Sequence, residues 1–293
     1  MPNSSEDCWA TWILSRRQAG KPVSPESAKQ LHRYRDQVLD NGQIRRGTTL
    51  LDIGCGDGLV GFGALDRVGP QGRVVFLDIS GDLLNRCRQT AASLNALDRC
   101  EFVNGSADNL TAIQPESVDV VTTRSVLIYV KAKQECFKEF FRVLKRGGRL
   151  SIGEPINRFC YPEPPGRLRG YDVDPILPLA EKVQAIYRRL QPPDTDPMLD
   201  FDERDLLSLA DQVGFSEVHL DYRATIKTEP DKEDWETFYG RAGNPLIPTL
   251  REATEDALTP EERAQFVAYL QPLVEQGRGT SREAFAYLWA YKK

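Results

Sequence analysis

Residues 50–58, with the sequence LLDIGCGDG, constrain the fold of this chain more than any other stretch. An apolar run ends in Asp52, and a second apolar run, 59–64, predicts the start of a helix. The loop between them is built on alternate glycines, Gly54, Gly56 and Gly58. Glycines permit a left-handed backbone and a close approach to a ligand, and a helix start offers free N–H groups. This unit predicts an α/β fold with a nucleoside-containing cofactor at the end of its first strand.

Two kinds of cofactor fit this loop. Residues 56–61 satisfy the dinucleotide fingerprint G-x-G-x-x-G. A pyrophosphate on the loop would, however, be repelled by the carboxylates of Asp52 and Asp57. S-adenosylmethionine carries a sulfonium and an ammonium, and both cations would be attracted by the same carboxylates. The loop therefore favours S-adenosylmethionine, with a nicotinamide or flavin dinucleotide as the alternative.

Short apolar strands followed by polar loops recur along the chain. Further strands are predicted at 73–78, 101–103, 118–123 and 149–154. A helix that closes within 137–148 precedes the last of them. The second strand ends in Asp78, whose carboxylate can accept hydrogen bonds from both ribose hydroxyls of a nucleoside. The third strand leads into residues 104–110, and the fourth leads into a bend at Arg124.

In this order the motifs resemble the class I S-adenosylmethionine-dependent methyltransferases, in the small-molecule branch that includes the quinone C-methyltransferases. The resemblance covers about residues 30–155, and residues 200–224 more loosely. It implies a Rossmann-like, seven-stranded, mostly parallel sheet in the order 3-2-1-4-5-7-6, with helices on both faces. It also implies S-adenosyl-L-methionine as the cofactor and S-adenosyl-L-homocysteine as the product.

The resemblance assigns the cofactor contacts to the strand ends and to one N-terminal helix, predicted over 25–40. We expect these contacts from Asp52, Gly54, Cys55, Gly56, Asp78, Ile79, Ser106, Ala107, Asp108, Arg124 and Tyr34. Ser106 departs from the family pattern, in which this position is commonly an Asp that reads the adenine amino group. A neutral hydroxyl accepts only a weaker hydrogen bond, so Asp108 is the candidate to take that part.

Charge and hydropathy narrow the range of partners. The net charge is −5, from 38 Lys and Arg against 43 Asp and Glu, so we expect no nucleic-acid partner. No apolar run approaches the ~20 residues needed to cross a bilayer, and the N-terminus lacks the features of a signal peptide. We therefore expect no membrane association and a cytoplasmic location. Whether the chain forms a homodimer is left open by the sequence.

The six cysteines show no C-x-x-C pair and no histidine at metal-ligand spacing. We expect no metal site and interpret the cysteines as small apolar residues kept reduced. The alternative is a thiol site for arsenite, because arsenite methyltransferases share the fold that this chain resembles. Only Cys55 and Cys160 are expected near the methyl donor.

The core pattern is interrupted twice, and the interruptions indicate a cap. The N-terminal helices and the cofactor-binding core are predicted at 1–154, and the core continues at 201–224 and ends with a final strand at 282–293. The two insertions are 155–200 and 225–281. We expect a helix over 201–214 and a strand over 217–222 in the core, and helices over 231–240, 246–258 and 260–276 in the second insertion. Both insertions follow strands that end at the cofactor edge, so we expect a helical cap that encloses a small organic acceptor. A cap used for dimerisation is the alternative.

Transfer of a sulfonium methyl is an in-line displacement that needs mainly positioning and exclusion of water, although an oxygen or nitrogen acceptor also needs a base. His32 and His219 are interpreted as a surface and a structural histidine. Glu154, at the end of the fifth strand, and Tyr129 are the catalytic candidates, with support of a loop as the alternative role for Glu154. Aromatic candidates for the acceptor pocket are Tyr161, Tyr171, Trp235 and Tyr239.

These inferences together predict a methyltransferase that acts on carbon or oxygen of a small-molecule metabolite. The alternatives are a protein or nucleic-acid methyltransferase, and a non-catalytic S-adenosylmethionine-binding protein. Proline clusters at 161–166 and 190–197 flank a predicted helix over 176–190. Because stiff proline segments can act as joints, we expect residues 158–200 to form a lid, with a static wall as the alternative.

Overall fold

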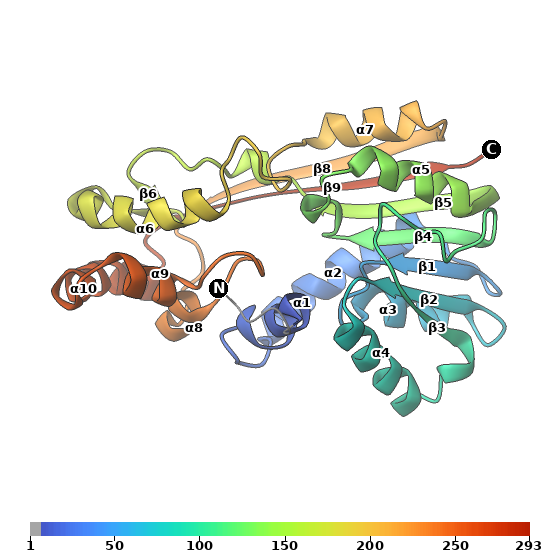
Figure 1. The fold of residues 1–293 in the computed structure, drawn as a ribbon, viewed down its shortest axis with the longest axis horizontal. Helices are drawn as coiled ribbons and strands as arrows, with labels where there is room; N and C mark the ends of the chain where they lie inside the picture. Colours follow the sequence, from blue (N-terminus) through green and yellow to red (C-terminus); the bar gives the residue numbers. More distant parts are fainter. Residues whose placement is uncertain (1–6) are drawn as a thin grey trace. The chain divides into compact units, whose positions relative to one another are not determined.

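The computed structural model describes residues 7–293, which form two compact units. The sheet unit comprises Ser24–Ile156, Phe201–Arg223 and Phe285–Lys293. The helical unit comprises the described residues up to Val23 together with Asn157–Asp200 and Ala224–Ala284. The chain therefore leaves the sheet unit after its fifth strand and again within its sixth (Figure 1).

A seven-stranded sheet forms the centre of the sheet unit. Its strands are β1 (Thr49–Ile53), β2 (Arg73–Asp78), β3 (Cys100–Asn104), β4 (Val118–Arg124), β5 (Leu144–Pro155), β8 (Ser216–Thr228) and β9 (Thr280–Tyr291). The order β3-β2-β1-β4-β5-β9-β8 confirms the predicted order, with β8 and β9 as the predicted sixth and seventh strands. The first five strands pair in parallel, and β9 runs antiparallel to β5.

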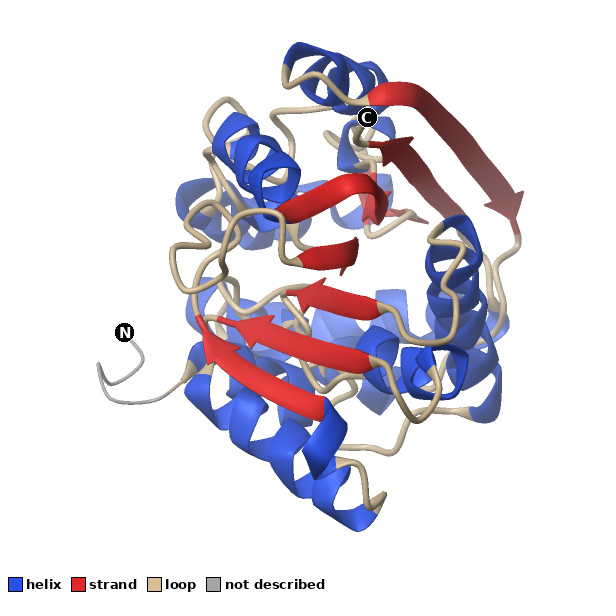
Figure 2. Cartoon of the chain, turned by 90° about the vertical axis from the view of Figure 1, so that its right-hand side faces the viewer, coloured by secondary structure: helices blue, strands red, loops and turns tan. Residues whose placement is uncertain are grey.

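Helices cover both faces of this sheet, as predicted (Figure 2). They are α2 (Pro25–Asn41), α3 (Leu59–Val68), α4 (Gly81–Ser93), α5 (Lys133–Val143) and α7 (Glu203–Gln212), with 3₁₀ turns at Leu97–Arg99 and Leu127–Tyr129. β2 and β3 lie on one side of β1 and β5 lies on the other. Right-handed crossovers therefore place α3 and α4 on one face and α5 on the opposite face. One buried cluster joins α2, α3 and α4 to the strands through Leu39, Ala64, Leu84 and Phe76.

The helix boundaries follow from their caps. The side chain of Ser24 accepts a hydrogen bond from the Ser27 N–H, and Pro25 occupies the first turn of α2. The side chain of Asp202 forms a capping box with Asp205, so α7 begins two residues after the predicted start. α5 ends at Val143, because Leu144 already pairs with β4.

The helical unit contains helices, short turns and one small hairpin, besides the end of β8 and the start of β9. Its elements are α1 (Cys8–Thr11) with a π-turn at Trp12–Arg16, a 3₁₀ turn at Asn157–Phe159, β6 (Arg167–Leu168), β7 (Tyr171–Asp172), a 3₁₀ turn at Asp174–Ile176, α6 (Leu177–Leu190), α8 (Trp235–Gly240), α9 (Leu250–Ala257) and α10 (Pro260–Gln276). Asp234, Thr249 and Thr259 cap α8, α9 and α10. The predicted starts at 231 and 246 were too early, because these caps fix later ones.

α6 belongs to the apolar core of the helical unit. Its Ala180 and Val183 are fully buried and share one cluster with Leu250 of α9 and Phe266 of α10. The N-terminal arm is attached to the same unit, since the Trp12 indole N–H donates to the Ala242 carbonyl at 2.9 Å. Opening of residues 158–200 as a lid stays a prediction. No helix among residues 7–293 is both long and apolar enough to cross a membrane.

Candidate functional site

The glycine loop after β1 requires its glycines for steric reasons. Gly54, Gly56 and Gly58 have φ of +62°, +57° and +90°, a region that other residues rarely adopt. A Cβ atom on Gly54 would lie 2.3 Å from Val126 Cγ2 of the loop after β4. The loop therefore brings its backbone against the next strand's loop, and α3 begins directly after it.

Asp52 lies beneath this loop, with its side chain out of contact with solvent. Its Oδ2 accepts a hydrogen bond from the Gly61 N–H at 2.9 Å, and its Oδ1 accepts one from the Thr122 hydroxyl at 3.1 Å. Burial raises the pKa of Asp52 to about 7. Asp52 thus ties β1 to α3 and β4. This arrangement favours a supporting role over the direct cofactor contact that we expected, because only 1% of the residue is exposed.

Asp78 links the end of β2 to the glycine loop. Its Oδ2 accepts a hydrogen bond from the Gly56 N–H at 2.8 Å, and its Oδ1 accepts one from the Ser80 N–H at 2.9 Å. A carboxylate has about four acceptor positions in all. The next residue, Ile79, is an apolar residue that is 53% exposed. The Asp78 carboxylate, which is bonded to two backbone N–H groups, and the exposed side chain of Ile79 are therefore neighbours at this edge of the sheet.

The loop after β3 is attached to the same place. The Asn104 side-chain amide donates to the carbonyls of Asp78 and Ile79, at 3.1 and 3.0 Å. The Ser106 hydroxyl donates to the carboxylate of Asp108, and the residue between them, Ala107, is buried. The structure thus brings together the two candidates for reading an adenine amino group.

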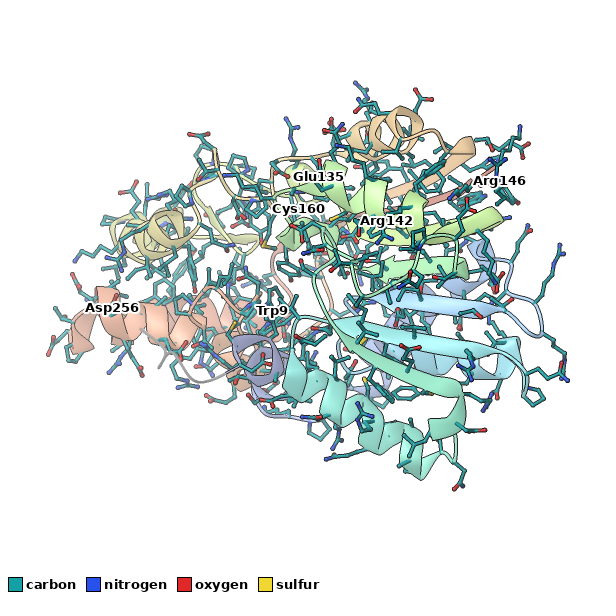
Figure 3. The ribbon with its side chains drawn as sticks, turned by 45° about the vertical axis from the view of Figure 1, so that its right-hand side comes forward. Trp9, Glu135, Arg142, Arg146, Cys160 and Asp256 are labelled. Carbon is teal, nitrogen blue, oxygen red and sulfur yellow. The ribbon has the colours of Figure 1, made fainter. Side chains whose placement is uncertain are left out.

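An ion pair that the sequence analysis missed holds the following segment. Arg142 lies on α5 (Figure 3), and its guanidinium donates to the carbonyls of Leu110 and Ile113 at 2.7 and 3.0 Å. The carboxylate of Glu139 accepts from this guanidinium at 2.7 Å and from the Leu110 N–H at 2.6 Å. The only signal in the sequence is Glu and Arg three positions apart on a helix, a spacing that surface pairs share.

Glu154 is fully buried at the end of β5. Its Oε1 accepts a hydrogen bond from the Val126 N–H at 3.0 Å, and its Oε2 accepts one from the Ile128 N–H at 3.3 Å. Burial raises the pKa of Glu154 to about 7, against the effect of these hydrogen bonds. Both oxygens are directed to the loop after β4. This geometry favours the alternative role, support of a loop, over the role of a base.

The other candidates of the sheet unit lie around these loops. Tyr129 is half-buried in the 3₁₀ turn that Glu154 supports. The Arg124 guanidinium donates to the Ser125 hydroxyl at 3.3 Å. Tyr34 of α2 stacks on Phe285 of β9, with ring centroids 4.7 Å apart.

One cysteine pair lies at the glycine loop. The thiols of Cys55 and Cys87 are 3.8 and 3.3 Å from the Gly56 carbonyl oxygen, whereas the Cys160 thiol contacts the Arg282 carbonyl within the helical unit. Residues 7–293 contain no group of three His, Cys, Asp or Glu side chains suited to a metal ion.

The helical unit contains a cavity of about 790 Å³. It is lined by the 157–169 segment, one side of α6, residues from 191–199 and Gly243, Asn244 and Ile247. Of the four aromatic residues predicted for an acceptor pocket, Tyr161 lines this cavity.

The other three aromatic candidates lie in the apolar core of the helical unit. Trp235 stacks on Tyr239 at 4.7 Å, and Tyr171 packs edge-on against Phe238 at 5.4 Å. Each ring of this size buries a large apolar surface when it packs in a core. This packing explains their position away from the cavity.

The chain is similar to known methyltransferases over about two fifths of its length. A family model described as "Methyltransferase domain" matches residues 44–164. An arsenite methyltransferase of Halobacterium salinarum is 33% identical over 117 residues, which are 40% of this chain and 29% of that protein. A ubiquinone/menaquinone biosynthesis C-methyltransferase of Salmonella arizonae is 30% identical over 125 residues, 42% of this chain and 49% of that protein. The chain thus spans less than half the length of these curated relatives.

The fold is similar over a longer stretch. The crystal structure of a putative methyltransferase from Bacillus halodurans superposes with a TM-score of 0.53, covering 88% of this chain and 98% of the other at 19% identity. The matched family segment, residues 44–164, contains the glycine loop, Asp78, the Ser106–Asp108 pair and Glu154.

Proposed function

We propose that the chain, whose residues 44–164 match a family model described as "Methyltransferase domain", binds S-adenosylmethionine and transfers its methyl group to carbon or oxygen of a small organic molecule. The observation that carries the proposal is the hydrogen bond between the Asp78 carboxylate and the Gly56 N–H. It holds an acid for the ribose hydroxyls against the loop whose glycines let a cofactor approach.

The neighbouring residues extend this proposed cofactor site. Ile79 offers an exposed apolar surface to one face of the adenine, and the Ser106–Asp108 pair offers an acceptor for its amino group. The methionine end of the cofactor would lie along Gly54 and Gly56, with Arg124 at the bend after β4. Asp52 would support this site from below, through its hydrogen bonds to α3 and β4.

The protein contributes to the reaction mainly by positioning the cofactor and the acceptor. The sulfonium supplies an activated methyl group, so transfer is an in-line displacement that leaves S-adenosylhomocysteine. Glu154 orders the loop that carries Tyr129, and its oxygens are already used by backbone N–H groups. We therefore favour an acceptor whose carbon or oxygen is already nucleophilic over one that needs a strong base. Tyr129 is the side chain proposed to contact it.

The acceptor is proposed to be a small molecule. The cavity of the helical unit, at about 790 Å³, has the size of sites that enclose molecules of this kind. The acidic net charge of −5 offers no attraction to nucleic acid, which disfavours that alternative. A non-catalytic protein, the other alternative, would bind the cofactor at the same site but would not transfer its methyl group.

A transfer assay tests this function. Purified protein is incubated with S-adenosylmethionine labelled in its methyl group and with a panel of phenols, quinols, enols and other small nucleophiles. The expected result is label in at least one product and an equivalent amount of S-adenosylhomocysteine. A protein that binds S-adenosylhomocysteine but labels none of the panel, and labels protein or RNA instead, would contradict the proposed acceptor class.

A further inference from the structure

The outer edge of β8 is unusually long and exposed. β8 is the last strand in the order of the sheet and pairs on one side with β9. It contains 13 residues, and every residue from Asp221 to Glu229 is exposed. An edge strand presents unpaired N–H and C=O groups, and proteins usually shorten, bend or cover such edges. This edge therefore calls for a partner strand or a device that excludes one.

The side chains of β8 divide into two faces. One face is apolar and consists of Val218, Leu220, Tyr222, Ala224 and Ile226. Tyr222 and Ile226 leave 39% and 55% of their surface exposed. The other face carries acids in its first half and bases in its second half, in the order Glu217, Asp221, Arg223 and Lys227. An edge strand whose charges served only to repel other strands would not need its acidic and basic residues in this order.

The order of charges is complementary to itself. When two copies of a strand pair antiparallel about a two-fold axis perpendicular to the sheet, the axis passes through one residue. Residues equally far from that residue then lie opposite each other. With the axis at Tyr222, Asp221 lies opposite Arg223 of the second copy, and the reverse pair forms as well. On the apolar face, Leu220 lies opposite Ala224.

The nearest other registers are of two kinds. An axis at Asp221 or at Arg223 would place two like charges directly opposite each other, which is destabilising. An axis at Leu220 would place Asp221 opposite His219 and Glu217 opposite Arg223, and an axis at Ala224 would place Asp221 opposite Lys227. These two registers are the competitors that an experiment has to distinguish.

The ends of β8 contribute little to the choice of register. Glu217 has a φ of +51°, which departs from an extended strand. Lys227 already pairs with Asp231 at 2.7 Å in its own chain, which weakens the register with the axis at Ala224. The residues that favour an axis at Tyr222 are therefore 218–226.

From this pattern we propose that β8 is a homodimer interface, at which a second copy of the chain continues the sheet antiparallel with the axis at Tyr222. The strand supplies fewer than the 20–30 residues per partner of most stable interfaces. The dimer is therefore expected to dissociate at micromolar concentrations. This inference goes beyond the proposed methyl transfer and does not depend on it.

Charge reversal tests the interface through sedimentation velocity over a range of concentrations. Asp221→Arg and Arg223→Asp should each weaken dimerisation by about tenfold or more, because both attractive pairs become repulsive. The double variant D221R/R223D should restore dimerisation if the axis lies at Tyr222. With the axis at Leu220 the new acid at position 223 would face Glu217, and with the axis at Ala224 the new base at position 221 would face Lys227. Neither competing register would therefore be restored.

The matched control for charge reversal is Asp98→Arg. This exposed position lies next to β3, at the other end of the sheet order, and its reversal should leave dimerisation unchanged. A wild-type chain that stays monomeric at high micromolar concentration would overturn the interface itself. Single reversals at 221 and 223 that still dimerise normally would overturn it as well.

Cysteine cross-linking tests the position of the axis. Opposite residues of an antiparallel pair have Cα atoms about 4.5–5.5 Å apart, a distance that a disulfide spans. Under mild oxidation, Tyr222→Cys should give a covalent dimer, while Ala224→Cys and the wild-type chain with its six cysteines should not. Cross-linking through Leu220→Cys or Ala224→Cys in place of Tyr222→Cys would overturn the proposed register.

Discussion

The carboxylate of Asp78 accepts a hydrogen bond from the backbone N–H of Gly56 at 2.8 Å, across 22 residues of sequence. The bond joins the end of β2 to the loop after β1, two neighbouring parallel strands. The position of the acid is thereby fixed by the same backbone that forms the glycine loop. A change at either residue should therefore weaken cofactor binding, because it also disturbs the position of the other residue.

Asp78→Ala should lower the affinity for S-adenosylhomocysteine by about 2–4 kcal/mol, because it removes charge-assisted hydrogen bonds to the ribose and to the loop. Isothermal titration calorimetry measures this loss. Asp78→Asn, which keeps the shape and one acceptor oxygen, should lose less. Equal affinities of wild type and Asp78→Ala would show that Asp78 supports the loop and does not contact the cofactor.

Gly54→Ala should abolish cofactor binding and lower the free energy of unfolding by about 1–3 kcal/mol. The new Cβ would meet Val126 Cγ2 at 2.3 Å, at a φ of +62° that strains any other residue. The matched control is Gly81→Ala in the first turn of α4, where nothing lies within 4 Å of the added carbon. Chemical denaturation should find that control neutral or slightly stabilising, because alanine restricts the unfolded chain. Similar losses in both variants would refute the steric explanation.

Arg142→Ala should release the segment after the Ser106–Asp108 pair. Arg142 and Glu139 together hold the backbone of Leu110 and Ile113, so hydrogen exchange in residues 106–113 should increase in the variant. The free energy of unfolding should fall by about 1–3 kcal/mol. Lys138→Ala, which breaks an exposed pair with Glu135 on the same helix, is the control and should cost less than about 0.5 kcal/mol. Unchanged exchange in 106–113 would mean that the ion pair does not hold the segment.

Two buried carboxyl groups give stability a defined pH dependence. Burial raises the pKa values of Asp52 and Glu154 to about 7, above their unfolded values near 4. The folded state therefore binds more protons than the unfolded state between these limits, so stability is greatest below pH 4 for these groups and falls as pH rises to about 7. Each group should contribute on the order of 4 kcal/mol to this fall.

Denaturation curves recorded at several pH values check this sign. Asp52→Asn and Glu154→Gln should each flatten the fall between pH 4 and 7, whereas Glu101→Gln at an exposed position should leave it unchanged. A wild-type stability that rises through this interval, with variants that do not alter its slope, would show that both carboxyl groups are charged in the folded protein.

The strand order and the glycine loop could be predicted because each depends on a local pattern: alternation of apolar strands with polar loops, and glycines at positions of positive φ. The direction of a side chain at a strand end is not local. Asp52 and Glu154 fall in the expected place, yet both turn inward to backbone N–H groups of distant segments. No spacing in the sequence distinguishes this orientation from one that faces a ligand.

The helical unit was harder to predict for a related reason. Its aromatic residues have the composition of a binding pocket, but a small unit also needs large rings for its own core. Trp235 and Tyr239 serve that need, whereas Tyr161 lines the cavity. The hairpin of β6 and β7 has two residues per strand, too few to produce a recognisable alternation.

The glycine loop and Asp78 are proposed to form a site for S-adenosylmethionine. Calorimetric titration of the purified protein with S-adenosylhomocysteine and, separately, with NAD tests it most directly. We predict micromolar binding of S-adenosylhomocysteine and none of NAD, because the carboxylates around the loop repel a pyrophosphate. Tighter binding of NAD than of S-adenosylhomocysteine would contradict it.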